Sequence, residues 1–306
     1  MWLVGGAGML GSAVTAALSR AGLDFVSTDI ELDITDSRSV NGFAQDHAFT
    51  HFINCAAYTN VDGAESEPER AMAVNARGPE NLARAAGVVG ASLLHISTDF
   101  VFSGEASRPY REDDPCSPVN AYGRSKLEGE RSLLALARTA RPASCGLFIV
   151  RTSWLFGENG PSFVGTMLSL VCSQERLQVV IDQTGRPTYC TDLAAAVLDL
   201  LGLGNPAEGS TQLRALSPPS GIYHFANAGE TTRYDFALGV LEAARRAGFP
   251  VRTTKIDPAL TSAFPRPAAR PAFSVLSTER IESALGRVPR HWRETLDDYL
   301  ANARKA

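Results

Sequence analysis

MWLVGGAGMLGSAVTAALSRAG (residues 1–22) opens the chain, and none of its first nineteen residues carries a charged side chain. A short apolar strand is predicted at residues 2–4, and three glycines spaced three apart follow it where a helical pattern begins. In such a turn the first glycine permits a tight bend, the second lets a pyrophosphate approach the backbone, and the third lets the helix lie close on the sheet. The stretch therefore predicts a dinucleotide-binding turn, whose cofactor-binding positions are Gly5, Gly8, Met9, Leu10 and Gly11.

A membrane-targeting segment is the alternative interpretation of this apolar start. An export signal needs a basic region before its apolar run, whereas the first basic residue here is Arg20. Glycines in a helix interior cost about 1 kcal/mol each relative to alanine, and four of them stand within seven positions, at 5, 6, 8 and 11. We therefore expect no membrane association and a cytoplasmic location.

The composition indicates a globular protein with a sizeable core and a small-molecule ligand. The 306 residues are 44% hydrophobic, enough for a sizeable core. A formal net charge of −4 offers no broad basic surface, so nucleic acid is not an expected partner. The five cysteines include no close C-x-x-C pair, so neither a disulfide framework nor a zinc site is predicted.

Short apolar or β-branched runs alternate with longer amphipathic stretches along the chain. This alternation is typical of a parallel sheet covered by helices. One helix is predicted to begin near Thr35 and Asp36, whose side chains can cap a first turn, and another to follow Ser66. Irregular loops are expected at 205–221 and 263–273. The strands are predicted near residues 2–4, 24–28, 51–55, 92–97, 146–150, 177–181 and 222–226.

Two aspartates follow the second predicted strand. Asp29 lies at its end, 21 residues after Gly8, where a carboxylate can accept hydrogen bonds from the adenosine ribose. A carboxylate there repels a 2′-phosphate, which weakly favours NADH over NADPH. Asp33 is a second cofactor-binding candidate, near the adenine, but a role in a turn or in the first turn of the next helix is an equally good interpretation.

A tyrosine and a lysine share one face of a predicted helix in NAYGRSKLEGE (residues 120–130). Tyr122 and Lys126 are four residues apart, about one helical turn. Thr98 follows an apolar strand, at the sheet edge where open α/β folds bind ligands. An ammonium near a phenol should lower the pKa of the tyrosine, so we expect Tyr122 to transfer a proton in carbonyl chemistry, with Thr98 binding the same oxygen. A surface tyrosine beside a solvated lysine is the plainer alternative.

These motifs resemble the extended short-chain dehydrogenase/reductase family and, within it, the dTDP-4-dehydrorhamnose reductases. The resemblance covers nearly the whole chain. Besides the glycine turn, it rests on NCAAYTNVDGAESEPERAMAVNA (54–76), STDFVF (97–102), YGRSK (122–126), RTSWLFG (151–157), DQTGRPT (182–188) and RPAFSVL (270–276).

The resemblance implies an α/β fold, a Rossmann-type doubly wound parallel sheet with a smaller C-terminal substrate-binding domain. The dinucleotide-binding domain would comprise residues 1–155, with 177–205 and 221–227 returning to it. The substrate-binding domain would comprise residues 156–176 and 228–306.

The resemblance also implies roles for individual residues. Asn75 would join Thr98, Tyr122 and Lys126 as a catalytic residue that supports a proton relay, and Lys126 and Tyr122 would also contact the cofactor. The nicotinamide half would be lined by Ala56, Ala57 and Tyr58. The sugar would be faced by Asp99, Phe100, Val101 and Trp154, although Trp154 has about even odds of being a core aromatic. The substrate phosphates would be bound by Arg270 and, less strongly, Arg186, because guanidinium groups grip phosphate oxygens.

Phe100 separates the sugar chemistries that such enzymes perform. Dehydratases of this kind carry an acid directly after the Thr-Asp pair, and phenylalanine here argues for ketone reduction by NADH or NADPH. The expected substrate is a nucleotide-linked 4-keto sugar, dTDP-linked by resemblance. An epimerase and a non-catalytic regulatory subunit are the alternatives. The resemblance allows a homodimer. No metal is expected, since no convincing glutamate stands near 188–194, and Ser162 and Gly165 depart from the common reductase pattern.

Overall fold

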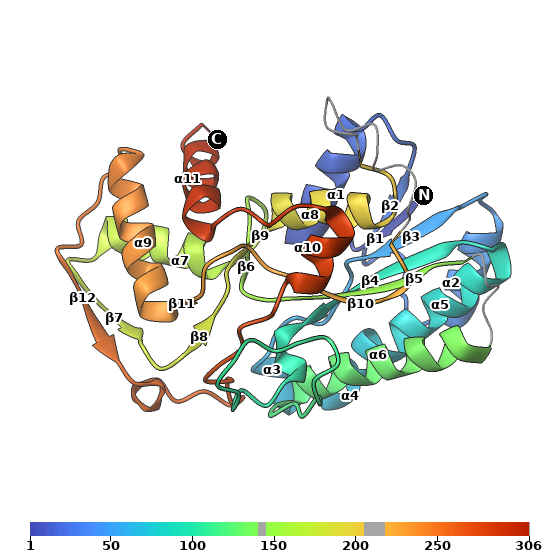
Figure 1. Cartoon of the computed structure of the whole chain (residues 1–306), viewed down its shortest axis with the longest axis horizontal. Coiled ribbons are helices and arrows are strands. Elements are labelled where there is room, and N and C mark those ends of the chain that lie inside the picture. The colour runs from blue at the N-terminus through green and yellow to red at the C-terminus, as the bar shows by residue number, and fades with distance from the viewer. Residues whose placement is uncertain (140–144, 205–217, 306) are drawn as a thin grey trace.

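A computed structural model describes residues 1–139, 145–204 and 218–305 of the chain. Its centre is a six-stranded parallel sheet in the order β10-β5-β4-β3-β1-β2 (Figure 1). All five pairings are parallel, so every connection crosses the sheet by a helix or loop. The strands are β1 (Trp2–Val4), β2 (Val26–Thr28), β3 (His51–Asn54), β4 (Ser92–Thr98), β5 (Leu147–Thr152) and β10 (Gly221–Phe225).

Helices cover both faces of this sheet because alternate residues of each strand are apolar on opposite sides. In β1, Leu3 belongs to one apolar core while Trp2 and Val4 belong to the other. Continuous apolar runs of this kind are typical of buried parallel strands. Helices α1 (Met9–Arg20), α8 (Cys190–Leu200) and α10 (Glu279–Leu285) cover the first face, and α2 (Ser37–Gln45), α5 (Gly78–Val89) and α6 (Ala121–Thr139) cover the second (Figure 1).

Short helical turns connect strand β3 to helix α5. These are α3 (Gly63–Ser66), α4 (Pro68–Met72) and the π-helical turn η1 (Ala73–Arg77). A 3-10 turn, η2 (Asp99–Val101), follows β4 directly. All four turns contact α6. Their residues therefore lie between the sheet and the start of that helix.

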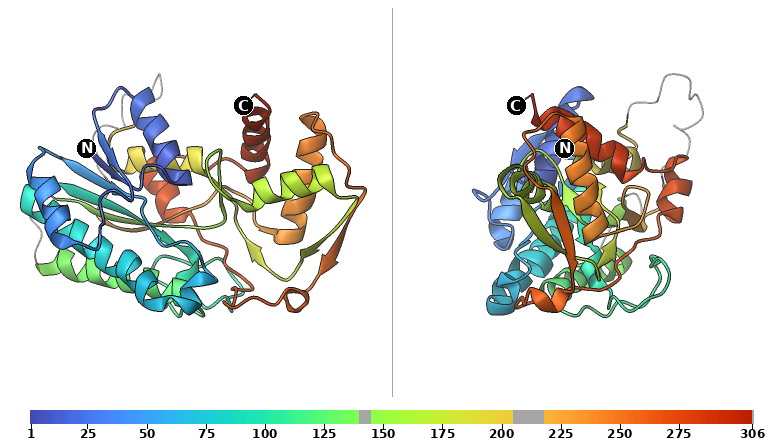
Figure 2. Two further views of the ribbon diagram at one scale, coloured as in Figure 1. Left: turned by 180° about the vertical axis from the view of Figure 1, so that it is seen from behind. Right: turned by 90° about the vertical axis from the view of Figure 1, so that its left-hand side faces the viewer.

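A second, smaller body lies beyond the carboxyl ends of the strands and has its own apolar core (Figures 1 and 2). Phe156, Phe236 and Trp292 lie at its centre. Its helices are α7 (Phe163–Ser173), α9 (Arg233–Arg246) and α11 (Trp292–Ala303), with the short turn η3 (Thr261–Ala263). Its strands form three pairs: β7 (Arg176–Val180) with β12 (Lys255–Ala259), β6 (Leu155–Phe156) with β9 (Thr188–Tyr189), and β8 (Thr184–Gly185) with β11 (Thr231–Thr232).

Six of the seven predicted strands join the large sheet, and the seventh corrects the expectation for segment 177–205. The strand predicted near 177–181 forms as β7, but it pairs with β12 in the smaller body. Its alternating pattern exposes every second residue, whereas inner strands of the large sheet such as β1 and β5 are buried on both faces. Only the later part of that segment, α8, packs against α1 on the large sheet. The division into two domains stays a prediction.

The local predictions about helix starts and loops have mixed outcomes. Helix α2 begins one residue after Asp36, whose carboxylate accepts a hydrogen bond from the amide of Arg38 at 2.9 Å. The loop at 263–273 forms no regular element beyond its first residue, which ends η3. Most of the loop expected at 205–221 lies outside the described residues. In the described ranges, every helix is too short or too polar to cross a membrane.

Candidate active site

The glycine turn and the end of β3 meet where the strand order reverses, between β1 and β3. In sheets of this kind, ligands bind at such a point, outside the carboxyl ends of the strands. Gly5 has a φ of +79°, and a side chain there would come within 2.5 Å of the backbone nitrogen of Ala56. The amides of Gly5 and Gly6 both donate to the carbonyl of Thr28 in β2. The turn is therefore held tightly between its two neighbouring strands.

The start of α1 fits the diphosphate of a dinucleotide. A side chain at Gly11 would lie 2.0 Å from the carbonyl oxygen of Gly5, so only glycine lets the helix approach the turn. At Gly8 the nearest such contact is 3.4 Å, which leaves space beside the helix N-terminus. No side chain caps α1, so the amides of its first turn, including those of Met9 and Leu10, are available to an anion.

Asp29 sits where the sequence predicts but already holds the turn together. Its Oδ2 accepts a hydrogen bond from the amide of Ala7 at 2.8 Å, and its Oδ1 accepts one from Ile30. A carboxylate has further acceptor sites, so contact with a ribose stays a prediction. Asp33 accepts a hydrogen bond from the amide of Thr35 ahead of α2, which favours its interpretation as a turn residue.

Thr98 and Tyr122 come together because α6 starts very close to η2. Asn120 accepts a hydrogen bond from the amide of Gly123 and donates one to the carbonyl of Ala269, which fixes the beginning of the helix. A side chain at Gly123 would lie 2.2 Å from the carbonyl oxygen of Phe100. The Phe100 and Tyr122 rings meet edge to face, with centroids 5.7 Å apart. The side chains of Tyr122 and Thr98 are within hydrogen-bonding reach of each other.

The expected effect of Lys126 on Tyr122 is wrong for this structure. Burial raises the pKa of Tyr122 to about 12, hydrogen bonding with Thr98 acts in the opposite direction, and the charge of Asp99 adds to the rise. The Lys126 ammonium points elsewhere: it donates to the carbonyl of Ile96 at 2.7 Å and lies 3.2 Å from Nε2 of His95. Burial lowers the pKa of Lys126 to about 8. Tyr122 is therefore a protonated phenol at neutral pH.

Asn75 holds the loop after β3 against α6. Its Oδ1 accepts a hydrogen bond from the amide of Tyr58 at 2.8 Å, and its Nδ2 donates to the carbonyl of Tyr58 and to the hydroxyl of Ser125. This fixes the backbone after Ala56 and Ala57, the loop predicted to line the nicotinamide. These contacts occupy the Asn75 amide, so a proton relay through it stays a prediction.

The three residues predicted to face the sugar from η2 differ in exposure. Asp99 is 1% exposed, and its Oδ2 has no hydrogen-bond partner. Burial raises the pKa of Asp99 to about 6, while hydrogen bonding by the Ser274 and Thr98 side chains and the charge of Arg233 act in the opposite direction. Phe100 is half-buried beside Tyr122. Val101 is fully buried in a small core with Phe102, and its contact with the sugar stays a prediction.

Trp154 lies between the two bodies and supports an arginine that the sequence analysis missed. The Arg233 guanidinium carbon lies 3.6 Å from the Trp154 ring centroid. Burial lowers the pKa of Arg233 to about 10, and the charge of Asp99 acts against this. Arg233 lies 111 positions beyond Tyr122 on a helix of the other body, so no local spacing could connect them.

The two predicted phosphate-binding arginines lie in different surroundings. Arg270 forms an ion pair with Asp62 at 3.0 Å, and its charge is felt at Arg233. Arg186 instead donates to the hydroxyl of Thr278 at 3.2 Å, next to α10, and its Nε has no partner. Both phosphate roles stay predictions. Among the described residues, no group of three or more His, Cys, Asp or Glu side chains could hold a metal ion.

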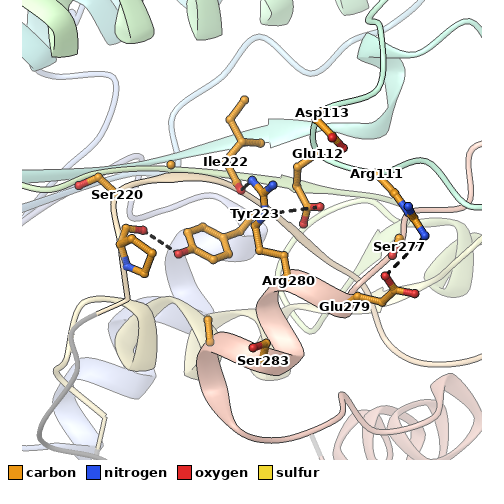
Figure 3. A pocket seen from close by; sticks show the side chains of 13 residues that line it. Arg111, Glu112, Asp113, Ser220, Ile222, Tyr223, Ser277, Glu279, Arg280 and Ser283 are labelled. Atoms are coloured by element: carbon orange, nitrogen blue, oxygen red, sulfur yellow. Dashed lines mark hydrogen bonds and ion pairs between the residues drawn. The ribbon is translucent and has the colours of Figure 1, made fainter.

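A separate cavity of about 560 Å³ lies between α10 and β10 (Figure 3). Its charged side chains face each other: Arg280 lies 3.9 Å from Glu112, and Arg111 lies 3.9 Å from Glu279. None of the residues predicted for the active site lines it. The cavity therefore belongs to a part of the surface that the chemistry above does not use.

The parallel sheet, the glycine turn and the Thr98–Tyr122–Lys126 set together define an extended short-chain dehydrogenase/reductase. Comparisons with known proteins narrow this class. The family model for the RmlD substrate binding domain matches residues 1–305. The chain is 42% identical over 299 residues to the dTDP-4-dehydrorhamnose reductase of Streptomyces griseus, which covers 97% of this chain and 92% of that protein. The chain therefore belongs to the dTDP-4-dehydrorhamnose reductase family.

Solved structures of such reductases have the same fold. The dTDP-4-dehydrorhamnose reductase of Clostridium acetobutylicum superposes with a TM-score of 0.86 at 38% identity, covering 99% of both chains. The enzyme of Bacillus anthracis, solved in complex with NADP, gives 0.84 at 33% identity and covers 98% of both chains. The doubly wound Rossmann-type fold and the family resemblance predicted from the sequence are confirmed.

Proposed function

We propose that this chain catalyses the reduction, by NADH or NADPH, of the 4-keto group of a nucleotide-linked deoxysugar, with dTDP-4-dehydrorhamnose converted to dTDP-rhamnose. One observation carries the proposal. The protonated phenol of Tyr122 lies with Thr98 at the carboxyl end of β4, and a glycine turn shaped for a dinucleotide follows β1 at the same edge of the sheet. The names of the relatives point to the same reaction.

Each side chain of the site would have its own task in this reaction. The glycine turn and the α1 N-terminus would hold the dinucleotide, which supplies a hydride when bound. Tyr122 would donate to the sugar carbonyl oxygen, and the Thr98 hydroxyl, whose single hydrogen goes to Asp99 in this structure, would have to turn that hydrogen towards the carbonyl to add to its polarisation. As that carbonyl carbon gains hydride, Tyr122 transfers its proton to the oxygen, and an alcohol results. Lys126 has three donors and uses at most two on Ile96 and His95, so one stays available for a ribose hydroxyl.

Two alternatives predict different cofactor use. An epimerase returns its hydride to the sugar and consumes no NAD(P)H, whereas a reductase consumes one per product. A regulatory subunit binds nucleotide without turnover. The side chain of Phe100, packed on Tyr122, supplies no acid for dehydration. The complete set of Thr98, Tyr122 and Lys126 supports turnover.

The finer points of the proposal concern cofactor choice, location and assembly. Asp29 at the end of β2 supports a weak preference for NADH, while the Bacillus anthracis relative was solved with NADP. We keep a cytoplasmic location and a homodimer as parts of this proposal.

The test is a direct assay of the purified chain. We expect NADH or NADPH absorbance at 340 nm to fall only when dTDP-4-dehydrorhamnose is added, with one cofactor oxidised per dTDP-rhamnose formed. Steady-state constants for both cofactors would measure the preference. Conversion of the sugar without net oxidation would favour an epimerase, and cofactor binding without either would favour a regulatory subunit.

A further inference from the structure

The amino group of Lys126 is buried between two polar partners. Lys126 is 2% exposed, and its Nζ donates to the carbonyl oxygen of Ile96 at 2.7 Å. On another side, Nζ lies 3.2 Å from Nε2 of His95, a residue that is 0% exposed. A carbonyl oxygen accepts from an ammonium and from an amine alike. His95 tells the two forms apart, because an ammonium has three hydrogens and no lone pair, whereas an amine has two hydrogens and one lone pair.

The tautomer of His95 follows from the hydrogen bonds of Asn54, the last residue of β3. The backbone amide of Ala56 donates to Oδ1 of Asn54 at 3.0 Å, which fixes the orientation of that side-chain amide. Its Nδ2 therefore donates to Nδ1 of His95, at 3.0 Å. Burial and the charge of Lys126 hold the pKa of His95 well below its usual value of 6.5, so the ring is neutral. A neutral imidazole carries one hydrogen, which must then be on Nε2, the atom that faces Lys126.

This tautomer and an ammonium would place two donors against each other. The Nε2–H of His95 finds an acceptor only in the lone pair of a neutral amine on Lys126. The amine then gives one hydrogen to the Ile96 carbonyl and keeps the other for a ribose hydroxyl of the cofactor. An ammonium would also keep one hydrogen for the ribose. The two forms therefore differ in charge and in their fit to His95, and only the amine fits.

The charged and titratable groups near Lys126 give an ammonium little compensation. Burial lowers the pKa of Lys126 to about 8, against the charges of Glu130 and Cys55. The Glu130 carboxylate is already paired with Arg151 at 2.7 Å, and burial raises the pKa of the Cys55 thiol to about 12, so this thiol is uncharged at neutral pH. Tyr122, one turn earlier on α6, is a protonated phenol. A buried charge without a free counter-charge is costly, which again favours the amine.

We propose that His95 is a positioning residue for Lys126: with its tautomer fixed by Asn54, it donates a hydrogen bond to the lysine and holds it as a neutral amine. The inference rests on the proposed function in one respect, that Lys126 belongs to a reductase site. An ammonium one helical turn from Tyr122 would favour the ionised phenol. The amine leaves Tyr122 in the protonated form, which can give its proton to the sugar oxygen.

The experiment observes Lys126 directly by NMR, because the chain has only three lysines, at positions 126, 255 and 305. Cofactor-free protein labelled with carbon-13 at the lysine Cε atoms is titrated from about pH 6 to about pH 11. Lys255 and Lys305 are exposed and serve as internal references. We expect the Lys126 signal to titrate at lower pH than both. His95→Gln should raise its midpoint by about one pH unit, a tenfold gain in proton affinity, because glutamine can turn its carbonyl oxygen towards an ammonium.

The matched control is His47→Gln, which should leave the Lys126 midpoint unchanged. His47 packs instead against the rings of Phe43 and Phe49, and its Nδ1 lies 2.8 Å from the Phe43 carbonyl oxygen. A midpoint that does not rise in folded His95→Gln would overturn the proposal.

A second measurement needs no variant, so it holds even if His95→Gln does not fold. Nitrogen-15 NMR of the five histidines in wild type reads the tautomer of His95. Hydrogen on Nε2 supports the proposal, and hydrogen on Nδ1 overturns it. If wild type reduces no keto sugar, the proposed function fails, while the two NMR results still decide whether His95 holds Lys126 as an amine.

Discussion

Two buried carboxylates stand at the carboxyl end of β4, and their surroundings are opposite. Glu130, on α6, accepts hydrogen bonds from Nη2 of Arg151 at 2.7 Å, from Nε of Arg151 at 3.0 Å and from the Ser97 hydroxyl at 2.5 Å. Asp99 is equally buried, but its Oδ2 has no hydrogen-bond partner within 3.5 Å, the Ser274 side chain is its other polar neighbour, and Arg233 forms no ion pair with it within 4.0 Å.

The difference separates structure from function. A buried charge that is fully paired fixes the position of two elements, here α6 and β5, and has nothing left to offer a ligand. A buried charge that is left half-satisfied lowers stability and persists where a ligand completes it. Ser97 and Thr98 are neighbours in β4, yet the Ser97 hydroxyl donates to Glu130, which is fully paired, and the Thr98 hydroxyl donates to Asp99, which is not.

The largest effect on stability is expected from breaking the buried ion pair between Glu130 and Arg151. Glu130→Gln leaves the Arg151 guanidinium buried without its counter-charge, and removing one partner of a buried pair costs about 3–5 kcal/mol. We expect the free energy of unfolding in urea to fall by this amount. Glu128→Gln is the control, because Glu128 lies on the same helix in an exposed pair with Arg131 at 3.6 Å. Equal, small losses in both variants would contradict the assigned role of Glu130.

The second-largest effect is a pH dependence of the free energy of unfolding, caused by Asp99. The folded-state pKa of Asp99, about 6, lies above its ordinary value of 3.8. Between these values the folded chain binds the proton more tightly than the unfolded chain. The contribution of Asp99 to the free energy of unfolding therefore falls as pH rises from about 4 to about 6, by about 3 kcal/mol.

Asp99→Asn removes this dependence. Urea unfolding at several pH values should show the variant gaining on wild type by about 3 kcal/mol across that interval, and then staying level above it. A difference that is constant with pH would show that Asp99 does not carry a raised pKa. The same variant should bind dTDP-rhamnose more weakly, while Glu130→Gln should leave the sugar contacts intact in whatever fraction stays folded.

The smallest effect is expected from displacing the indole ring of Trp154. Gly185→Ala would bring a methyl group within 2.6 Å of the indole, so the ring and Arg233 must shift together. We expect KM for the keto sugar to rise about tenfold, equivalent to about 1.4 kcal/mol, with dTDP affinity unchanged. Gly42→Ala is the control, since nothing lies within 4 Å of a Cβ there and alanine is the better helix residue. An unchanged KM in Gly185→Ala would separate Trp154 from sugar binding.

The glycine turn could be predicted from sequence because its parts are local. Gly5, Gly8 and Gly11 act through backbone geometry over seven positions, and the strand and helix that flank them follow from the same short stretch. The place of Thr98 at the end of β4 was predictable for a similar reason, since it directly follows an apolar run.

The full set of residues that face the sugar could not be predicted from local sequence in the same way. Asp99 and Trp154 follow the neighbouring strands β4 and β5 and were predicted from the resemblance, whereas Arg233 is brought onto Trp154 only by the packing of the smaller body. The expected lowering of the Tyr122 pKa failed because helical spacing places Lys126 one turn away without saying where its long side chain ends. It ends on His95 and Ile96.

The central claim is that the phenol of Tyr122 supplies the proton as a sugar ketone is reduced. Tyr122→Phe measures this most directly, through single-turnover oxidation of bound NADPH by dTDP-4-dehydrorhamnose. The account predicts a loss of at least about 100-fold in that rate, with NADPH still bound and the affinity for dTDP unchanged. Tyr234→Phe, which removes a hydroxyl bonded to the carbonyl of Ile256 in the smaller body, should keep the wild-type rate. A Tyr122→Phe enzyme that reduces the sugar as fast as wild type would contradict it.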